Sequence, residues 1–261
     1  MSIAELNYIS MYYILIFFVA HWYLSLFMQT FFLHRYAAHQ MFTMNKFWER
    51  VFYVLTWLLQ GSSFLSPRAY GVMHRLHHAY ADTENDPHSP SYSTGLFDMM
   101  WKTKAIYNDI LHGRAKLDPK FLKNVPNWDF IENLGDNWMG RVAWGTLYTL
   151  FYMKFVPEGM WYLYLLLPIH YLMGPVHGAV INWFAHKFGY VNFKVNDTAK
   201  NLLPFDFLMF GEGYHNNHHK LGGRANFGVK WHEFDPAYPF ILLFNALHII
   251  KLKKNNDLNY M

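Results

Sequence analysis

The sequence predicts an all-α integral membrane protein with about three transmembrane helices, one interfacial helix and a cytosolic helical cap. Composition is the first reason: 53% of the 261 residues are hydrophobic and 15% are charged, against about 25% charged in soluble domains. Three apolar segments are long enough to cross a bilayer, and clusters of histidine follow these segments. No linker or internal repeat divides the chain, so a single domain over residues 1–261 is expected.

The first predicted transmembrane helix covers residues 8–33, an apolar stretch in which His21 is the only ionisable group apart from tyrosines. As a helix it would extend about 39 Å, enough to cross a hydrocarbon core of about 30 Å. It lacks the basic start and the small-residue cleavage site of a secretory signal. We therefore expect it to be retained as a membrane helix.

Residues 47–65 form a second apolar stretch, interrupted by Glu49, Arg50 and Gln60. Histidine clusters lie on both sides of it, and the 34 residues between those clusters are too few for two crossings with turns. Because both clusters must lie on one side of the bilayer to meet, we predict an interfacial or shallowly re-entrant helix here.

Residues 137–156 and 160–183 are predicted to form a transmembrane hairpin. A Pro-Glu-Gly turn separates them, and the hairpin returns the chain to the side it left. Pro168 and Pro175 are expected to kink the second arm of the hairpin.

The polar segments give the orientation. Residues 81–136 read as an aqueous region with a short helix at about 95–111, and the chain is mixed polar again from residue 186. In this layout all but Lys154 of the 22 Lys and Arg residues lie on the histidine side. Because cytoplasmic flanks carry excess Lys and Arg, the histidine clusters are predicted to be cytosolic, with the N-terminus outside and the C-terminus inside.

Three histidine clusters carry the chemistry. One has the spacing H-x4-H, in residues 34–39, and the spacing H-x-x-H-H occurs twice, in residues 74–78 and 215–219. On a helix the residues i and i+4 share a face, so one segment can direct three nitrogens to one place, and two adjacent metals could be served. The predicted metal ligands are His34, His39, His74, His77, His78, His215, His218 and His219.

Imidazole ligands limit the kind of metal. Neutral imidazole suits iron, zinc, copper and nickel, whereas magnesium and calcium need oxygen ligands. The chain has no cysteine, which excludes thiolate sites and disulfides. The formal charge of +4 comes without a nucleic-acid motif, so anionic membrane lipid is the expected partner, and nucleic acid is not.

The order of these boxes resembles that of membrane-bound fatty acyl desaturases of the stearoyl-CoA (delta-9) type, over roughly residues 31–235. Asp-Pro-His at residues 86–88 and Gly-Glu-Gly at residues 211–213 add to the resemblance, as does an Asn-x-x-x-His motif at Asn182 and His186. The resemblance implies that His186 is a ninth metal ligand and that Asn182 holds a metal-bound water. Further matching positions are Arg224, Trp231, Glu233 and Asp235.

The resemblance also implies the reaction. Two ferrous ions would activate dioxygen, and two hydrogens would leave adjacent methylenes of a long acyl chain to give a cis double bond, with delta-9 as the family's usual position. The substrate would be a long-chain acyl-CoA or acyl-lipid. The chain includes no electron-transfer domain, so a separate donor resembling ferredoxin or cytochrome b5 is expected.

Other polar residues are assigned supporting roles, with no catalytic group separate from the metal centre. Metal-bound histidines need acceptors that fix their tautomer, and the candidates are Asp82, Glu84, Asp86, Asp206 and Glu212. Four basic residues are candidates for contacts with the substrate headgroup, although solvated basic side chains are the commoner case: Arg68, Arg75, Lys102 and Lys104.

Two alternatives stay open. An alkane or fatty acid hydroxylase, a sterol oxidase or a carotenoid ketolase would use the same histidine boxes, although hydroxylases often have H-x3-H in the first box. A metal transporter would place its ligands within the spans, where this chain has His21, His170 and His177 in no compact motif.

Overall fold

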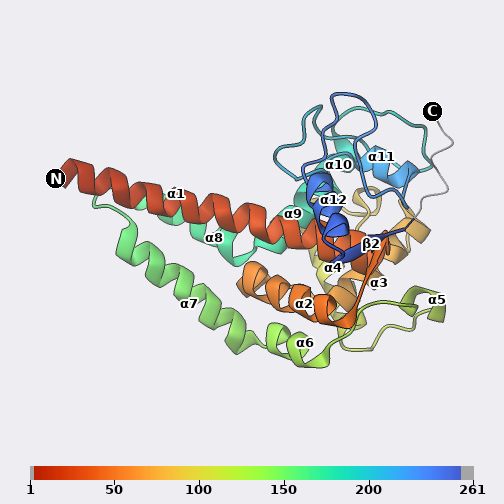
Figure 1. Cartoon of the computed structure of the whole chain (residues 1–261), viewed down its shortest axis with the longest axis horizontal. Coiled ribbons are helices and arrows are strands. Elements are labelled where there is room, and N and C mark those ends of the chain that lie inside the picture. Colours follow the sequence, from red (N-terminus) through yellow and green to blue (C-terminus); the bar gives the residue numbers. More distant parts are fainter. Residues whose placement is uncertain (1–2, 254–261) are drawn as a thin grey trace.

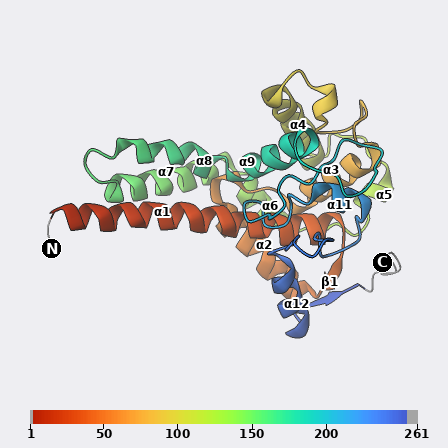
Figure 2. The same cartoon turned by 90° about the horizontal axis from the view of Figure 1, so that it is seen from above.

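The computed structural model describes residues 3–253 and divides into an arm and a head. In the arm, the N-terminal part of α1 (Ile3–Met28) runs beside α7 (Trp138–Phe155), η4 (Trp161–Leu166) and α8 (Leu167–Tyr171) (Figures 1 and 2). The start of α1 and the turn between α7 and η4 lie together at the far end of the arm. All the histidine boxes lie in the head, into which the C-terminal end of α1 extends.

The first helix is longer than predicted. α1 continues without a break into the π-helical segment η1 (Gln29–Ala38), so His34 lies inside the helix and His39 is its C-terminal capping residue. Within residues 3–253, the stretch Tyr8–Ala38 is the one continuous helix that is long and apolar enough to cross a membrane. The predicted span of residues 8–33 falls within it.

The predicted interfacial helix begins as expected and ends early. α2 (Lys46–Gln60) is capped by the side chain of Asn45, which accepts a hydrogen bond from Trp48 N. It stops at Gly61, whose φ of 51° is left-handed, and η2 (Gly61–Ser63) follows. The predicted helix of residues 47–65 is therefore wrong beyond residue 60.

Two short strands correct the all-α prediction. β1 (Phe42–Met44) pairs in antiparallel fashion with β2 (Ile250–Leu252). Phe42 and Ile250 are both buried, so the pairing closes the hydrophobic core beneath the first box. Strands of three residues are too short for an alternating pattern to be recognised in the sequence.

The predicted span of residues 160–183 is not a single helix. It consists of η4, α8, α9 (Met173–Ala179) and most of η5 (Val180–Phe184), and α10 (Ala185–Lys187) follows it. The axis bends by 79° between Trp161–Tyr171 and Met173–Lys187. The bend turns the chain from the arm into the head. These two halves qualify as a membrane span only if they are counted together, and α7 does not qualify in the same way. The number of spans therefore stays a prediction.

The head is built on the buried end of the first helix. Phe31 and Phe32 pack with α2, Phe42 of β1 and α12 in one hydrophobic cluster. α4 coincides with the helix predicted at about residues 95–111. The remaining elements of the head are α3 (Pro67–Tyr80), η3 (Pro90–Tyr92), α4 (Leu96–Leu111), α5 (Pro119–Leu122), α6 (Asp129–Asp136), α11 (His215–Lys220) and α12 (Tyr238–Ala246).

The second box approaches the first through a glycine. A Cβ atom on Gly71 of α3 would lie 3.0 Å from Ala37 O and 3.4 Å from Ala37 Cβ of η1. Glycine at this position lets the two backbones pack closely, which places the histidines of α3 opposite those of η1.

We expect Gly71→Val to force α3 away from η1 and to destabilise the protein by about 1–3 kcal/mol, the usual cost of overpacking. Thermal unfolding in detergent measures the effect. Gly95→Val is the matched control, because a Cβ at Gly95 would meet nothing within 4 Å. Equal melting temperatures for the two variants would contradict close packing at Gly71.

Candidate metal centre

The first histidine pair lies on η1 and at its end, and the helix type explains the spacing of the pair. His39 N donates to His34 O, five residues back, at 3.1 Å, which is the π-helical pattern. On an α-helix five residues would rotate the second side chain by about 140°, and the two rings would diverge. Here their centroids are 4.9 Å apart, so both imidazoles face the interior of the head.

The second box lies on α3 and divides its histidines between two directions. His74 and His78 are four residues apart on one face of the helix, and their Nε2 atoms are 3.0 Å apart. His77 lies on a neighbouring face, and its Nε2 is 3.2 Å from His219 Nε2. The second box therefore directs its histidine side chains to two different groups of histidines.

The third box lies on α11 and also divides its histidines between two directions. His215 and His219 share a face, with ring centroids 4.3 Å apart. His218 turns the other way and brings its Nε2 to 2.9 Å from His78 Nε2 and 3.0 Å from His34 Nε2.

The structure brings all nine predicted histidines together in two adjoining clusters. Within each cluster the nitrogens that could bind a metal lie within 4.8 Å of one another. The clusters touch where the rings of His78 and His219 have centroids 4.7 Å apart. The five-histidine cluster is His34, His39, His74, His78 and His218, and the four-histidine cluster is His77, His186, His215 and His219.

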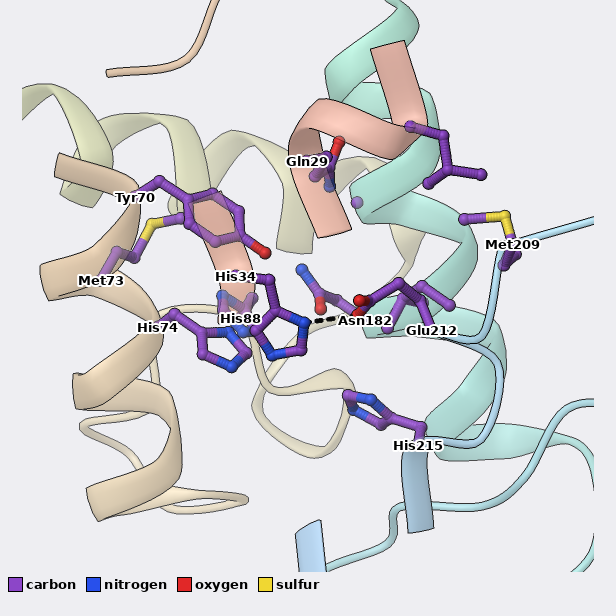
Figure 3. Close-up of a pocket in the computed structure, with 13 residues that line it drawn as sticks. Gln29, His34, Tyr70, Met73, His74, His88, Asn182, Met209, Glu212 and His215 are labelled. Carbon is purple, nitrogen blue, oxygen red and sulfur yellow. Dashed lines mark ion pairs between the residues drawn. The ribbon is translucent and has the colours of Figure 1, made fainter. Parts of the chain in front are cut away.

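His186 and Asn182 reach the centre from the bent segment. His186 on α10 places its Nε2 3.0 Å from His215 Nε2. Asn182 on η5 lines an enclosed cavity of about 30 Å³ together with His34, His215 and Glu212 (Figure 3). This volume has room for about one water molecule.

The donor set fits iron. The Nε2 atoms that face one another are 2.9–3.2 Å apart, and two ligands at right angles on a metal with bonds of about 2.1 Å would lie about 3.0 Å apart. The donors in both clusters are neutral nitrogens suited to iron or zinc, and not the oxygen shell that calcium or magnesium requires.

Carboxylates fix two of the imidazoles as predicted. His77 Nδ1 lies 2.9 Å from Asp86 Oδ1, and His34 Nδ1 lies 2.6 Å from Glu212 Oε2. Burial alone would raise the pKa of Glu212, but its contacts with His34 and Arg35 lower the pKa below the usual value. An ionised acceptor at Nδ1 keeps the proton on that nitrogen and leaves the Nε2 lone pair free for a metal.

Two acceptors were missed by the sequence reasoning. His219 Nδ1 lies 2.8 Å from Asp197 Oδ2, and His186 Nδ1 lies 3.1 Å from Thr198 Oγ1. Both acceptors come from a polar loop that no motif connects to the boxes. Asp82 then accepts from the backbone and hydroxyl of Thr198, both at 2.7 Å, and lies 3.8 Å from His186 Nδ1.

The other two predicted acceptors do not contact a histidine within the described residues. Glu84 is exposed in the loop after α3. Asp206 is buried and accepts from the backbone N–H groups of Met209, Gly211 and Gly213. It shapes the turn before the third box, so its contribution to the site is indirect.

A buried arginine connects the first box to the chain after the third. Arg35 is fully buried, with Nη2 2.7 Å from Asp235 Oδ2 and Nη1 3.3 Å from Glu212 Oε1. Its guanidinium also lies 3.8 Å from the centre of the Phe227 ring. Arg35 therefore holds the carboxylate that contacts His34.

The basic residues predicted to meet a headgroup have partners within the chain. Arg75 donates to the carbonyls of Ala37, Ala38, Phe121 and Lys123, which ties η1 to the α5 region. The headgroup role of these residues stays a prediction. Arg68 contacts Glu132 Oε2 and Leu111 O, Lys102 contacts Asp98, and Lys104 lies over the ring of Trp101.

His88 is a further histidine beside the site that was given no role. It is buried, neither ring nitrogen has a hydrogen-bond partner, and its ring centroid is 4.2 Å from that of His77. In the arm, His21 Nδ1 lies 2.6 Å from His170 Nδ1. Among the described residues, His21, His170 and His177 form no group of three metal donors.

Burial keeps the ligand imidazoles neutral. Desolvation lowers their pKa below the ordinary value of 6.5, and neighbouring imidazoles lower it further. The histidines with lowered pKa are His39, His74, His77, His78, His215, His218 and His219.

The metal-free protein should therefore lose stability as the pH falls below 6.5. Histidines of the unfolded chain take up protons there while the buried ones do not, so the free energy of unfolding falls by up to about 1.4 kcal/mol per pH unit for each such histidine. Chemical denaturation in detergent between pH 7.5 and 5.5 measures this slope. A free energy of unfolding that does not change over this range would contradict the burial of neutral imidazoles.

Asp197→Asn should weaken metal binding by the four-histidine cluster about 10- to 100-fold, because His219 loses its charged acceptor. Metal retained per chain after dialysis against a chelator measures the loss. Asp109→Asn is the control, since Asp109 pairs with Arg114 on the exposed surface. Equal retention by the two variants would show that Asp197 does not support the site.

Most of this chain is similar in sequence to known proteins. A family model described as Fatty acid desaturase matches residues 10–248. The chain is 30% identical over 223 residues to the sn-1 stearoyl-lipid 9-desaturase of Synechocystis sp., covering 84% of this chain and 64% of the relative. It is 29% identical over 226 residues to Delta-9 acyl-lipid desaturase 2 of Arabidopsis thaliana, covering 82% and 66%.

A third relative, the sn-1 stearoyl-lipid 9-desaturase of Anabaena variabilis, is 29% identical over 223 residues, covering 82% of this chain and 74% of the relative. The chain thus spans less than two thirds of the length of the first two relatives. The family model nevertheless matches most of the chain and includes every histidine of both clusters. The resemblance read from the histidine boxes is confirmed: the chain belongs to the fatty acid desaturase family.

Proposed function

We propose that this chain is a membrane-bound desaturase that inserts a cis double bond, at the delta-9 position, into a long acyl chain with dioxygen as co-substrate. The observation that carries the proposal is the pair of clusters, which bring nine imidazoles together in the head. The family's reaction accounts for a metal centre at this place. Desaturation breaks two unactivated C–H bonds, which needs a stronger oxidant than nicotinamide or flavin.

The five-histidine cluster would hold one iron ion and the four-histidine cluster the second. A bound pair of ferrous ions would activate dioxygen, which would take up two electrons from the acyl chain and two from a donor protein and leave as water. Asn182 lines the cavity next to His34 and His215, and its side chain would hold a water close to the metal.

The residues around the clusters prepare the ligands. Asp86 and Asp197 accept from the Nδ1 atoms of His77 and His219, so the lone pairs at Nε2 point inward. Six of the nine histidines are buried, and His39, His78 and His219 are half-buried. Exclusion of bulk water strengthens every electrostatic interaction inside and protects the reaction from side reactions.

The acyl chain would approach from the membrane side of the centre. Apolar side chains of α1 and of the bent segment lie beside the clusters, in the wall of the small cavity that also contains the polar side chains of Gln29, His34, His74, His88, Asn182, Glu212 and His215. The relatives are named for stearoyl-lipid and acyl-lipid substrates, which favours an acyl group esterified to a lipid over acyl-CoA. The apolar lining residues are Leu26, Met73, Gly178, Ile181 and Met209.

The arm would lie in the bilayer and the head at its cytosolic face. Lys154, the one basic residue assigned to the opposite side, is in the last turn of α7, near the far end of the arm. The donor resembling ferredoxin or cytochrome b5 would dock on the head. The predicted N-terminus outside and C-terminus inside involve residues 1–2 and 254–261, which lie outside the described residues.

Fatty acid analysis of a desaturase-deficient host tests the proposal. With a competent electron donor, the wild type should produce monounsaturated chains whose double bond is located by mass spectrometry. His218→Ala removes a ligand of the five-histidine cluster and should abolish the product. His232→Ala is the control, because His232 lies outside both clusters and should leave the product unchanged.

Hydroxylated chains from the wild type would contradict desaturation and would assign the protein to the hydroxylases. Unsaturated product from His218→Ala would contradict the role of the five-histidine cluster. No change in lipid composition with a working donor would contradict action on acyl chains.

A further inference from the structure

The outer face of α2 forms a groove that the proposed reaction does not use. The groove is open, has a volume of about 520 Å³, and is lined by one stripe of α2 and by Trp128 at the start of α6. Its residues recur at helical spacing, three to four apart, so they belong to a single face of α2. They are Lys46, Phe47, Arg50, Val51, Val54, Leu55 and Trp128.

The groove is charged at one end. Lys46 and Arg50 lie in the first turns of α2, and both are exposed. Arg50 has no ion-pair partner within residues 3–253, and its guanidinium lies 5.3 Å from the centre of the Trp128 ring. Lys46 Nζ is 2.7 Å from Glu49 Oε1, the buried carboxylate that also accepts from the Tyr36 hydroxyl. The charged end therefore carries one unpaired and one paired cation.

Other charges near this end do not cancel the cations. Lys253 and Lys46 line a common neighbouring pocket, which brings a third positive charge close. Asp129, the residue after Trp128, is not among the lining residues; it is exposed and accepts a hydrogen bond from Asn127. A ligand at this end would need to be an anion.

The rest of the groove is apolar and leads toward the arm. Val51, Val54 and Leu55 form its floor, and Leu58, 41% exposed, continues the stripe. Beyond α2, the Ser62 hydroxyl donates to Tyr171 O of α8 at 3.2 Å. The apolar end therefore points to the arm and the cationic end to the head.

We propose that this groove binds an anionic phospholipid of the bilayer, with the phosphate at Lys46 and Arg50 and an acyl chain along Val51, Val54 and Leu55. The direction agrees with the proposed membrane position of the arm, on which this inference rests. Exposed basic side chains beside an apolar face are the usual means of holding anionic lipids at an interface. The site is separate from the histidine clusters, so it can fail without affecting the desaturase proposal.

Native mass spectrometry in detergent, with phosphatidylglycerol and phosphatidylcholine as probes, tests the site. The wild type should retain phosphatidylglycerol in preference to phosphatidylcholine. The double variant Lys46→Gln/Arg50→Gln should bind phosphatidylglycerol about 25-fold more weakly, which corresponds to about 1 kcal/mol for each cation. Phe47→Ser, at a side chain 66% exposed, should weaken the binding of both lipids because it removes part of the apolar wall of the groove.

The matched control is Arg114→Gln/Lys194→Gln, which removes two exposed cations outside the groove and should bind phosphatidylglycerol as the wild type does. An equal loss in the control would show general charge attraction and overturn the site. Unchanged binding by the groove variant would overturn it as well. Retention of acyl-CoA without phosphatidylglycerol would overturn the assignment to a membrane lipid. Should the double variant fail to fold, Arg50→Gln alone carries the test, with about a fivefold loss expected.

Discussion

The head depends on one constraint: the lone pairs of nine imidazoles, six of them buried and three half-buried, must converge in one space. Neutral bases with Nε2 atoms about 3 Å apart repel one another unless cations lie between them. The protein must hold them in place before any metal binds. The π-helical η1, the close helix packing at Gly71 and the hydrogen bonds at Nδ1 all hold the imidazoles in place. Most segments of the head therefore help to position the histidine clusters.

Charge balance explains the carboxylates around the clusters. Two divalent ions would bring four positive charges into the site, and neutral imidazoles would bring none to offset them. Four carboxylates lie within reach of the ligand histidines: Asp82, Asp86, Asp197 and Glu212. A fifth, Asp235, is matched by buried Arg35. A site so composed can accept two divalent cations with little net charge left in a region of low dielectric constant.

The nine histidines that the structure brings together could be predicted from the sequence, because spacing on helices is a local property. The i, i+4 pairs, the third histidine of each H-x-x-H-H box and the H-x4-H pair can all be read from the sequence alone. The hydrogen-bond acceptors at the Nδ1 atoms of the histidines were harder to predict. Asp86 and Glu212 lie next to boxes and were found, whereas Asp197 and Thr198 come from a loop whose position depends on tertiary contacts. For the same reason the early end of α2 at Gly61 and the pairing of β1 with β2 were missed, since each depends on contacts distant in sequence. A kink in the second arm was expected from Pro168 and Pro175, but the size of the 79° bend between Tyr171 and Met173 was not.

The π-helical turn of η1 has an evolutionary consequence. Each π-turn contains one residue more than an α-turn, yet it returns the side chain to nearly the same direction. A helix can therefore absorb one inserted codon between His34 and His39 without displacing either ring from the centre. Box spacings of three and four intervening residues become structural equivalents, differing in local helix type. A lineage could pass from one spacing to the other in a single step and keep its metal site throughout.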